Sequence, residues 1–155
     1  MKIRKIKKSD IKNVSKLITE VVQNNFSGVY SDKVIKYFCE QNSVENIIKK
    51  LNNNTNYFVV ENKGRIIGVA GIKKDEIVSF HISVKHQGCG IGKRLMTFIK
   101  NFAKQNYIKK LKVHSSIPAV NFYKKCGFKF VKKVTNFVPN GDKYTTVLMK
   151  NKIFC

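Results

Sequence analysis

The spacing of hydrophobic residues predicts three helices in the first third of the chain. Apolar side chains there recur with the period of a helix face, at Ile11, Val14, Leu17, Ile18, Val21 and Val22. Ser9 or Asp10 can cap this helix, and the segment 26–30 is expected to end it. The Ser-Asp pair at 31–32 can cap a second helix. A third, short helix is expected over 43–51.

Alternating apolar and polar positions predict seven strands. These are expected over residues 2–6, 57–61, 65–73, 77–84, 111–115, 128–134 and 144–150. Residues 62–64 and 139–142 have the composition of tight turns between strands. One more helix is expected directly after the glycines at 88–92, and a short one over 117–128 that Gly127 ends.

The order of these elements predicts an α/β fold. In such a fold, helices would cover both faces of a central mixed, mostly antiparallel sheet of six to seven strands. The 155 residues, 43% of them hydrophobic, suit one globular domain that spans residues 1–155.

The charge of the chain is strongly positive, with 31 Lys and Arg against 9 Asp and Glu and a formal net charge of +22. Such a balance favours anionic partners, among them nucleic acid, an anionic membrane or a phosphate-bearing cofactor. The lysines are nevertheless scattered rather than clustered, and the bias toward Lys, Asn and Ile is also what genome base composition produces. Nucleic acid is therefore not the expected partner.

The cysteines and the apolar runs indicate a cytoplasmic protein. Four cysteines without a C-x-x-C motif or histidines at metal-ligand spacing predict neither a disulfide framework nor a metal site. No apolar run is long enough to span a membrane, and residues 1–10 lack the apolar core of a signal peptide.

The segment 85–96, KHQGCGIGKRLM, places three glycines directly before a predicted helix. The amides of a helix N-terminus lack partners within the helix and lie at its positive end, which suits a phosphate group. Gly88, Gly90 and Gly92 would let a ligand reach these amides, and Lys93 and Arg94 add positive charge. A pyrophosphate site is the natural interpretation.

The spacing of these glycines fits neither of two common nucleotide-binding loops. Gly88 and Lys93 are too close together for G-x-x-x-x-G-K-[ST], and Arg94 stands where that loop has a hydroxyl. The dinucleotide fingerprint also requires an acidic residue further along, where this chain has none.

Two segments resemble the GNAT acetyltransferase superfamily. Residues 87–92, QGCGIG, are similar to its cofactor loop, Q/R-x-x-G-x-G/A after a strand. Residues 119–128, AVNFYKKCGF, resemble its A-x-x-F-Y-x-x-x-G-F element, and "IRKIKKSDI" and "GVAGI" also look like family counterparts. The resemblance spans nearly the whole chain. It implies the GNAT (acyl-CoA N-acyltransferase) fold and transfer of an acetyl group from acetyl-CoA to a primary amine in a ternary complex.

The resemblance also implies where acetyl-CoA binds. Its pyrophosphate would lie on the amides of residues 87–93, and its pantetheine arm would pair with the end of the strand 77–84. An amide near Ile82 would polarise the thioester carbonyl. The residues expected to bind the cofactor are Ile82, Ser83, Val84, Gln87, Gly88, Cys89, Gly90, Ile91, Gly92, Lys93 and Asn121.

Acetyl transfer to an amine needs a base for the amine and an acid for the departing thiolate. Tyr123 occupies the family position for the acid. The strand 77–84 carries no carboxylate, so Glu76 at its start and His81 are the candidate bases, with a water relay as a third option. Cys89, in a loop that faces the cofactor, is a poor location for a nucleophile.

The acceptor, a small-molecule or peptide amine, would bind near the first two helices. Four aromatic residues could line its cleft, or belong to the core: Phe26, Tyr30, Tyr37 and Phe38. The family usually has proline where Val84 stands, which should leave the strand end less rigid. The alternative is a non-catalytic, GNAT-like module that binds or senses coenzyme A, or a basic nucleic-acid-binding protein. The protein is expected to be a monomer or a homodimer, in which the last strands could pair.

Overall fold

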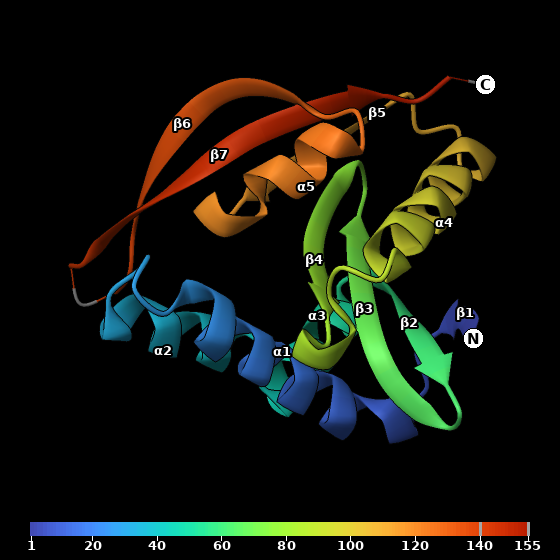
Figure 1. Cartoon of the computed structure of the whole chain (residues 1–155), viewed down its shortest axis with the longest axis horizontal. Helices are drawn as coiled ribbons and strands as arrows, with labels where there is room; N and C mark the ends of the chain where they lie inside the picture. Colours follow the sequence, from blue (N-terminus) through green and yellow to red (C-terminus); the bar gives the residue numbers. More distant parts are fainter. Residues whose placement is uncertain (140, 155) are drawn as a thin grey trace.

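The computed structural model describes residues 1–139 and 141–154, which form one seven-stranded sheet with helices on both faces (Figure 1). The strands are β1 (Lys2–Lys5), β2 (Asn56–Asn62), β3 (Arg65–Lys73), β4 (Glu76–Ile82), β5 (Lys110–Ser115), β6 (Lys129–Phe137) and β7 (Lys143–Lys152). Their order is β1-β2-β3-β4-β5-β7-β6. Only β4 and β5 run parallel, and the other neighbours are antiparallel. The predicted fold class is confirmed.

The helices divide between the two faces of the sheet. They are α1 (Ile11–Phe26), α2 (Asp32–Gln41), α3 (Val44–Asn52), α4 (Ile91–Gln105) and α5 (Val120–Lys125), with short 3-10 turns at Lys8–Asp10, Val84–His86 and Ile117–Ala119. On β2, Tyr57 and Val59 pack with α1, whereas Phe58 and Val60 face α4. This alternation, expected of a strand covered on both sides, produces two hydrophobic cores.

Serine side chains cap the second and third helices, and the cap of the second helix was predicted. Ser31 Oγ accepts a hydrogen bond from the amide of Val34, and Ser43 Oγ accepts one from the amide of Asn46. The expected side-chain cap of α1 was wrong, because Asp10 makes no such bond. Its carboxylate instead pairs with Arg4 at 2.7 Å, which ties β1 to the start of α1 and lowers the pKa of Asp10.

Glycines with a left-handed backbone conformation lie at two positions where the sequence predicts a turn or a helix end. Lys63 (φ 51°) and Gly64 (φ 76°) join β2 to β3 in the left-handed region that a two-residue hairpin requires. Gly127 (φ 95°) follows α5, which ends at Lys125, earlier than the predicted 117–128 helix. β6 runs to Phe137, beyond the predicted end at 134. Within the predicted turn over 139–142, Asn140 lies outside the described residues.

β4 pairs with β5 only at its beginning. Glu76 is opposite Lys112 and Ile77 is opposite Val113, and the two strands then separate. The register of β4 against β3 also shifts by one residue, because Gly71 is opposite Ser79 whereas Ile72 is opposite Ile77. Val78 is the extra residue of this bulge. The sheet therefore opens at the carboxyl end of β4.

Candidate active site

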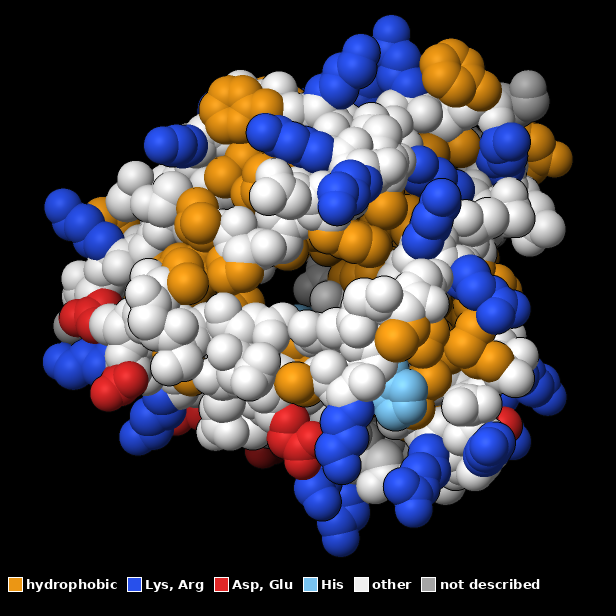
Figure 2. Space-filling model, viewed as in Figure 1, with side chains coloured by type: hydrophobic (Ala, Val, Ile, Leu, Met, Phe, Trp, Pro, Cys, Tyr) orange, Lys and Arg blue, Asp and Glu red, His pale blue; other side chains and the backbone are white. Residues whose placement is uncertain are grey.

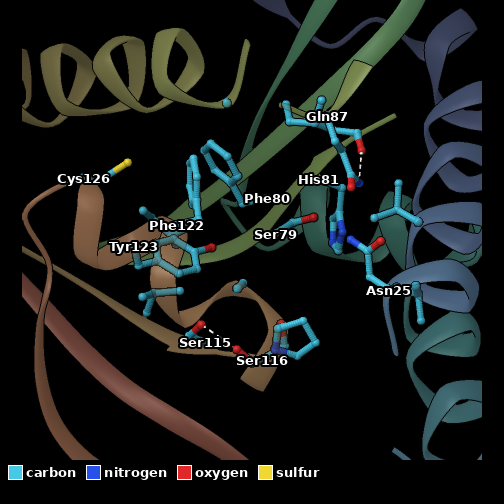
Figure 3. Close-up of a pocket in the computed structure, with 18 of the residues that line it drawn as sticks. Asn25, Ser79, Phe80, His81, Gln87, Ser115, Ser116, Phe122, Tyr123 and Cys126 are labelled. Carbon is cyan, nitrogen blue, oxygen red and sulfur yellow. Dashed lines mark hydrogen bonds between the residues drawn. The ribbon is translucent and has the colours of Figure 1, made fainter. Parts of the chain in front are cut away.

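A cavity of about 680 Å³ lies where β4 and β5 separate, and the molecule is visibly hollowed there (Figure 2). One wall comes from α1 and α2, the opposite wall from the first turn of α4 and from α5, and the floor from β4 and β5. Figure 3 shows side chains from these walls around the cavity. In the part of the chain that the structure describes, no strand covers the β5-facing edge of β4 beyond Ile77. The cavity therefore exposes main-chain groups as well as side chains.

The glycines before α4 serve two different purposes. Gly88 (φ 76°) and Gly90 (φ 83°) adopt left-handed backbone conformations, and a Cβ at either position would meet no heavy atom within 4 Å. Their surroundings are open, as a loop that receives a ligand requires. A Cβ on Gly92 would instead lie 2.9 Å from the Phe122 ring of α5. Gly92 lets α4 and α5 approach each other.

The free edge of β4 presents the main chain of Ile82 to the cavity. The amide of Ser83 donates to the carbonyl oxygen of Ile67 on β3 at 2.8 Å. Because successive residues of a strand point their amides to opposite sides, the amide and carbonyl of Ile82 point away from β3. The Gln87 side chain donates to this carbonyl oxygen at 3.0 Å (Figure 3). Gln87 thereby links the free edge to the glycine loop.

Tyr123 projects from α5 into the cavity and is only 5% exposed (Figure 3). Its ring packs edge-on against Phe128, Phe122 and Phe80. Burial raises the pKa of the Tyr123 phenol well above its usual range, and the neighbouring Cys126 thiol raises it further. The hydroxyl therefore keeps its proton throughout the physiological range.

His81 and Ser79 line the cavity from the face of β4 that meets α1, and Figure 3 shows the Asn25 side chain beside His81. Burial, with a smaller effect of the positive charge of Lys50, lowers the pKa of His81 to about 4. The imidazole is consequently neutral at physiological pH. Ser79 is 6% exposed, and its hydroxyl has no hydrogen-bond partner within the described residues.

The structure brings some of the predicted residues together and leaves others apart. Six of the predicted cofactor residues line the cavity, namely Ile82, Gln87, Gly88, Gly90, Gly92 and Lys93. Five do not line it with their side chains, namely Ser83, Val84, Cys89, Ile91 and Asn121. Glu76 also lies outside, at the closed end where β4 still pairs with β5. Of the two candidate bases, only His81 faces the cavity.

The four aromatic residues predicted near the acceptor divide in the same way. Phe26 and Phe38 line the cavity, whereas Tyr30 and Tyr37 do not. The Tyr30 hydroxyl donates to the carbonyl oxygen of Thr145 at 2.8 Å and accepts from the amide of Ile117 at 3.0 Å. Tyr30 therefore joins the α1–α2 connection to β7 and to the segment before α5.

Several lining residues are missing from the predicted site, among them Asn25, Asn42, Ser79, Ser115 and Thr146. The alternation of β4 does place Ser79 and His81 on one face, and this signal could have identified Ser79. The others come from α1, from the residue that follows α2, from β5 and from β7, and nothing in their local sequence brings them together.

In the described part of the chain, none of the helices is both long and apolar enough to cross a membrane.

Comparison with known proteins gives a family match and related folds. The family model described as "Acetyltransferase (GNAT) domain" matches residues 22–149. No curated protein sequence gives a match. A GCN5-related N-acetyltransferase structure from Rhodopseudomonas palustris superposes with a TM-score of 0.89 at 17% identity, covering 97% of this chain and 94% of that one.

Two further structures are similar over nearly their full length. The PaiA N-acetyltransferase of Thermoplasma acidophilum, solved in complex with coenzyme A, has a TM-score of 0.79 at 19% identity and covers 97% of this chain and 98% of its own. The ribosomal-protein-alanine N-acetyltransferase of Brucella melitensis has a TM-score of 0.73 at 16% identity, with 98% and 99% covered. At these identities the likeness concerns the fold.

Proposed function

The chain belongs to the GNAT acetyltransferase family, and we propose that it transfers the acetyl group of acetyl-CoA to a primary amine by direct attack within a ternary complex. The observation that carries the proposal is the unpaired edge of β4, which faces the Tyr123 hydroxyl across one cavity. A free strand edge can hold an extended, amide-bearing arm, and a buried phenol can donate to a leaving sulfur.

The residues present suit coenzyme A. The open glycine loop and the N-terminus of α4 offer amides to a pyrophosphate, and Lys93 lies beside them on the cavity wall. The main chain of Ile82 offers a donor and an acceptor to an extended arm. When bound, acetyl-CoA would supply an activated acetyl group and a thiol leaving group. A relative with this fold is named as a coenzyme A complex.

Tyr123 would act as the acid. Its phenol stays protonated because burial disfavours the phenolate. The negative charge that develops on a departing sulfur in the same buried surroundings is disfavoured for the same reason, so the proton moves toward the sulfur more readily than it would in water. The Ile82 amide would stabilise the developing oxyanion of the acetyl carbonyl.

His81 would accept a hydrogen bond from the attacking amine rather than remove its proton. A pKa of about 4 makes the imidazole a weak base, and an alkylammonium titrates near ~10.4. The neutral imidazole can still accept a hydrogen bond from the amine and orient its lone pair. The proton then leaves through the open cavity to solvent, with the Ser79 hydroxyl as a group that can hold a water on this route.

A free-thiol release assay with acetyl-CoA and a panel of amines tests the proposal. Replacement of Tyr123 by Phe should lower kcat roughly 100-fold and leave the Kd of coenzyme A within about twofold, because only the acid is lost. Tyr107→Phe, at an exposed tyrosine after α4, is the matched control and should behave as the wild type. An unchanged kcat in Tyr123→Phe contradicts the acid role. Coenzyme A binding without turnover of any amine favours the non-catalytic module instead.

A further inference from the structure

None of the nine acidic side chains of the protein lines the cavity. Asp10 and Glu61 both pair with Arg4 at the far end of the sheet, and Asp75 lies 3.9 Å from Lys112 outside the cavity. In Figure 2, the Asp and Glu side chains visible on this face lie away from the hollow. Among the described residues, the cavity therefore has no carboxylate to pair with an ammonium group.

Positive charge lies on either side of the part of the cavity that α1 and α2 line, where the acceptor would bind. Lys93 and Lys125 line the cavity from α4 and α5, the side proposed for coenzyme A. Behind the other wall, the half-buried Lys50 of α3 donates to the carbonyl oxygen of Gln41 at 2.8 Å. The wall that α1 and α2 form contains no charged side chain at all, only the residues Val21, Val22, Asn25, Phe26, Phe38 and Asn42.

We propose that the acceptor carries a single amino group and no further positive charge, on a largely apolar body. This inference rests on the proposed acetyl transfer and names its substrate class. A second ammonium group in this cavity would lose its hydration and gain no carboxylate in return, while Lys50 repels it. Val21, Val22, Phe26 and Phe38 instead offer apolar surface to the rest of the molecule.

The same surroundings assist the reacting amine itself. Desolvation and nearby positive charge both lower the pKa of an amine, so the cavity favours the neutral form that attacks. This accounts for a site whose lining carries no carboxylate base. A monoamine needs to lose one charge on entering, whereas a polyamine keeps at least one that must be buried.

Matched pairs of acceptors test the inference in the intact enzyme. One pair is 1-aminobutane and 1,4-diaminobutane, and the other is a short peptide with uncharged side chains and the same peptide with two added lysines. The singly charged member of a pair should have a kcat/KM at least about tenfold higher. The two pairs distinguish a small-molecule source from a peptide source. A diamine or lysine-rich peptide that is acetylated equally well or better overturns the inference, although the acetyltransferase function stands.

Asn25→Asp adds the missing charge at constant shape. The substitution should shift the ratio of kcat/KM for the diamine over the monoamine upward by about tenfold, because a carboxylate now faces the second ammonium. The ratio cancels any effect of the new charge on His81. Gln23→Glu places the same charge on an exposed position of α1 outside the cavity and should leave the ratio unchanged. An unchanged ratio in Asn25→Asp also overturns the inference. If neither pair of acceptors is acetylated although coenzyme A still binds, the proposed function itself is contradicted.

Discussion

His81 and Tyr123 show how burial sets the chemistry of single residues. Burial lowers the pKa of His81 and raises that of Tyr123, so in both residues the neutral form is favoured. The sequence places His81 on the polar side of a strand and Tyr123 in a family motif. It does not determine how much water each side chain loses, because the walls around them come from α1, α2 and α5.

The stability of the protein should depend on His81 between pH 6.5 and 4. In the unfolded chain a histidine titrates near ~6.5, whereas the pKa of His81 in the folded protein is about 4. The unfolded chain therefore binds more protons in this window, and the free energy of unfolding falls as the pH falls. His81→Gln should flatten this fall by about 3 kcal/mol.

Urea unfolding at a series of pH values measures this effect. His114→Gln, at an exposed histidine, is the control and should retain the wild-type slope. The lowered pKa of Asp10 acts at more acidic pH and equally in all three proteins. Parallel curves for wild type and His81→Gln would show that His81 titrates normally in the folded state.

At the scale of elements, the junction of α4 with α5 depends on a glycine. Gly92 has no Cβ where the Phe122 ring approaches, and Phe122 packs against Phe80 and Tyr123. The role of Gly92 is therefore steric, whereas at positions 88 and 90 the left-handed backbone conformation favours glycine. The sequence motif groups all three glycines, and only the packing of two helices separates their functions.

A double-mutant cycle tests the contact of Gly92 with Phe122. Gly92→Ala should destabilise the protein by about 1 kcal/mol, because displacement of the ring outweighs the gain in helix propensity. Phe122→Leu should relieve most of this cost, which gives a coupling energy of about 1 kcal/mol. Gly88→Ala, strained by its positive φ alone, should show no coupling to Phe122→Leu. Additive effects at Gly92 and Phe122 would refute the contact.

The elements themselves were largely predictable, and their exceptions have local causes. Serine caps, hairpin turns and helical periods depend on neighbours in the sequence, so α2, α3 and the β2–β3 hairpin were found correctly. The bulge at Val78 was not predicted, because it inserts one residue into an otherwise regular alternation. It places Ile77 in the same core as Ile82, whereas strict alternation would put them on opposite faces.

At the scale of the whole molecule, the chain has a net charge of +22, and none of its Asp or Glu side chains lines the cavity. Charges spread over the surface raise the local concentration of an anionic ligand, and salt screens this effect. Close charges such as Lys93 at the cavity wall are screened less. The overall charge and the local site therefore make separable contributions to the binding of coenzyme A.

The Kd of coenzyme A should rise about tenfold when KCl is raised from about 20 mM to about 200 mM. Lys93→Gln should weaken binding several-fold at either salt concentration, because it removes a charge at the site. Lys104→Gln, in the last turn of the same helix, changes the net charge equally and should have little effect. Isothermal titration measures all three proteins. Equal effects of the two substitutions would mean that only the overall charge matters.

The sequence alone determined the order of the elements, the α/β class and the position of the glycine loop, because these depend on local periodicity, capping and turn residues. The resemblance of two motifs added the family. The tertiary structure decided which residues share the cavity: it includes His81, Ser79 and Asn25, and it leaves Glu76 and Asn121 outside. It also decided that no carboxylate of the described residues lines this cavity. These features arise where strands separate and distant helices form opposite walls, and no local pattern of residues specifies such a juxtaposition.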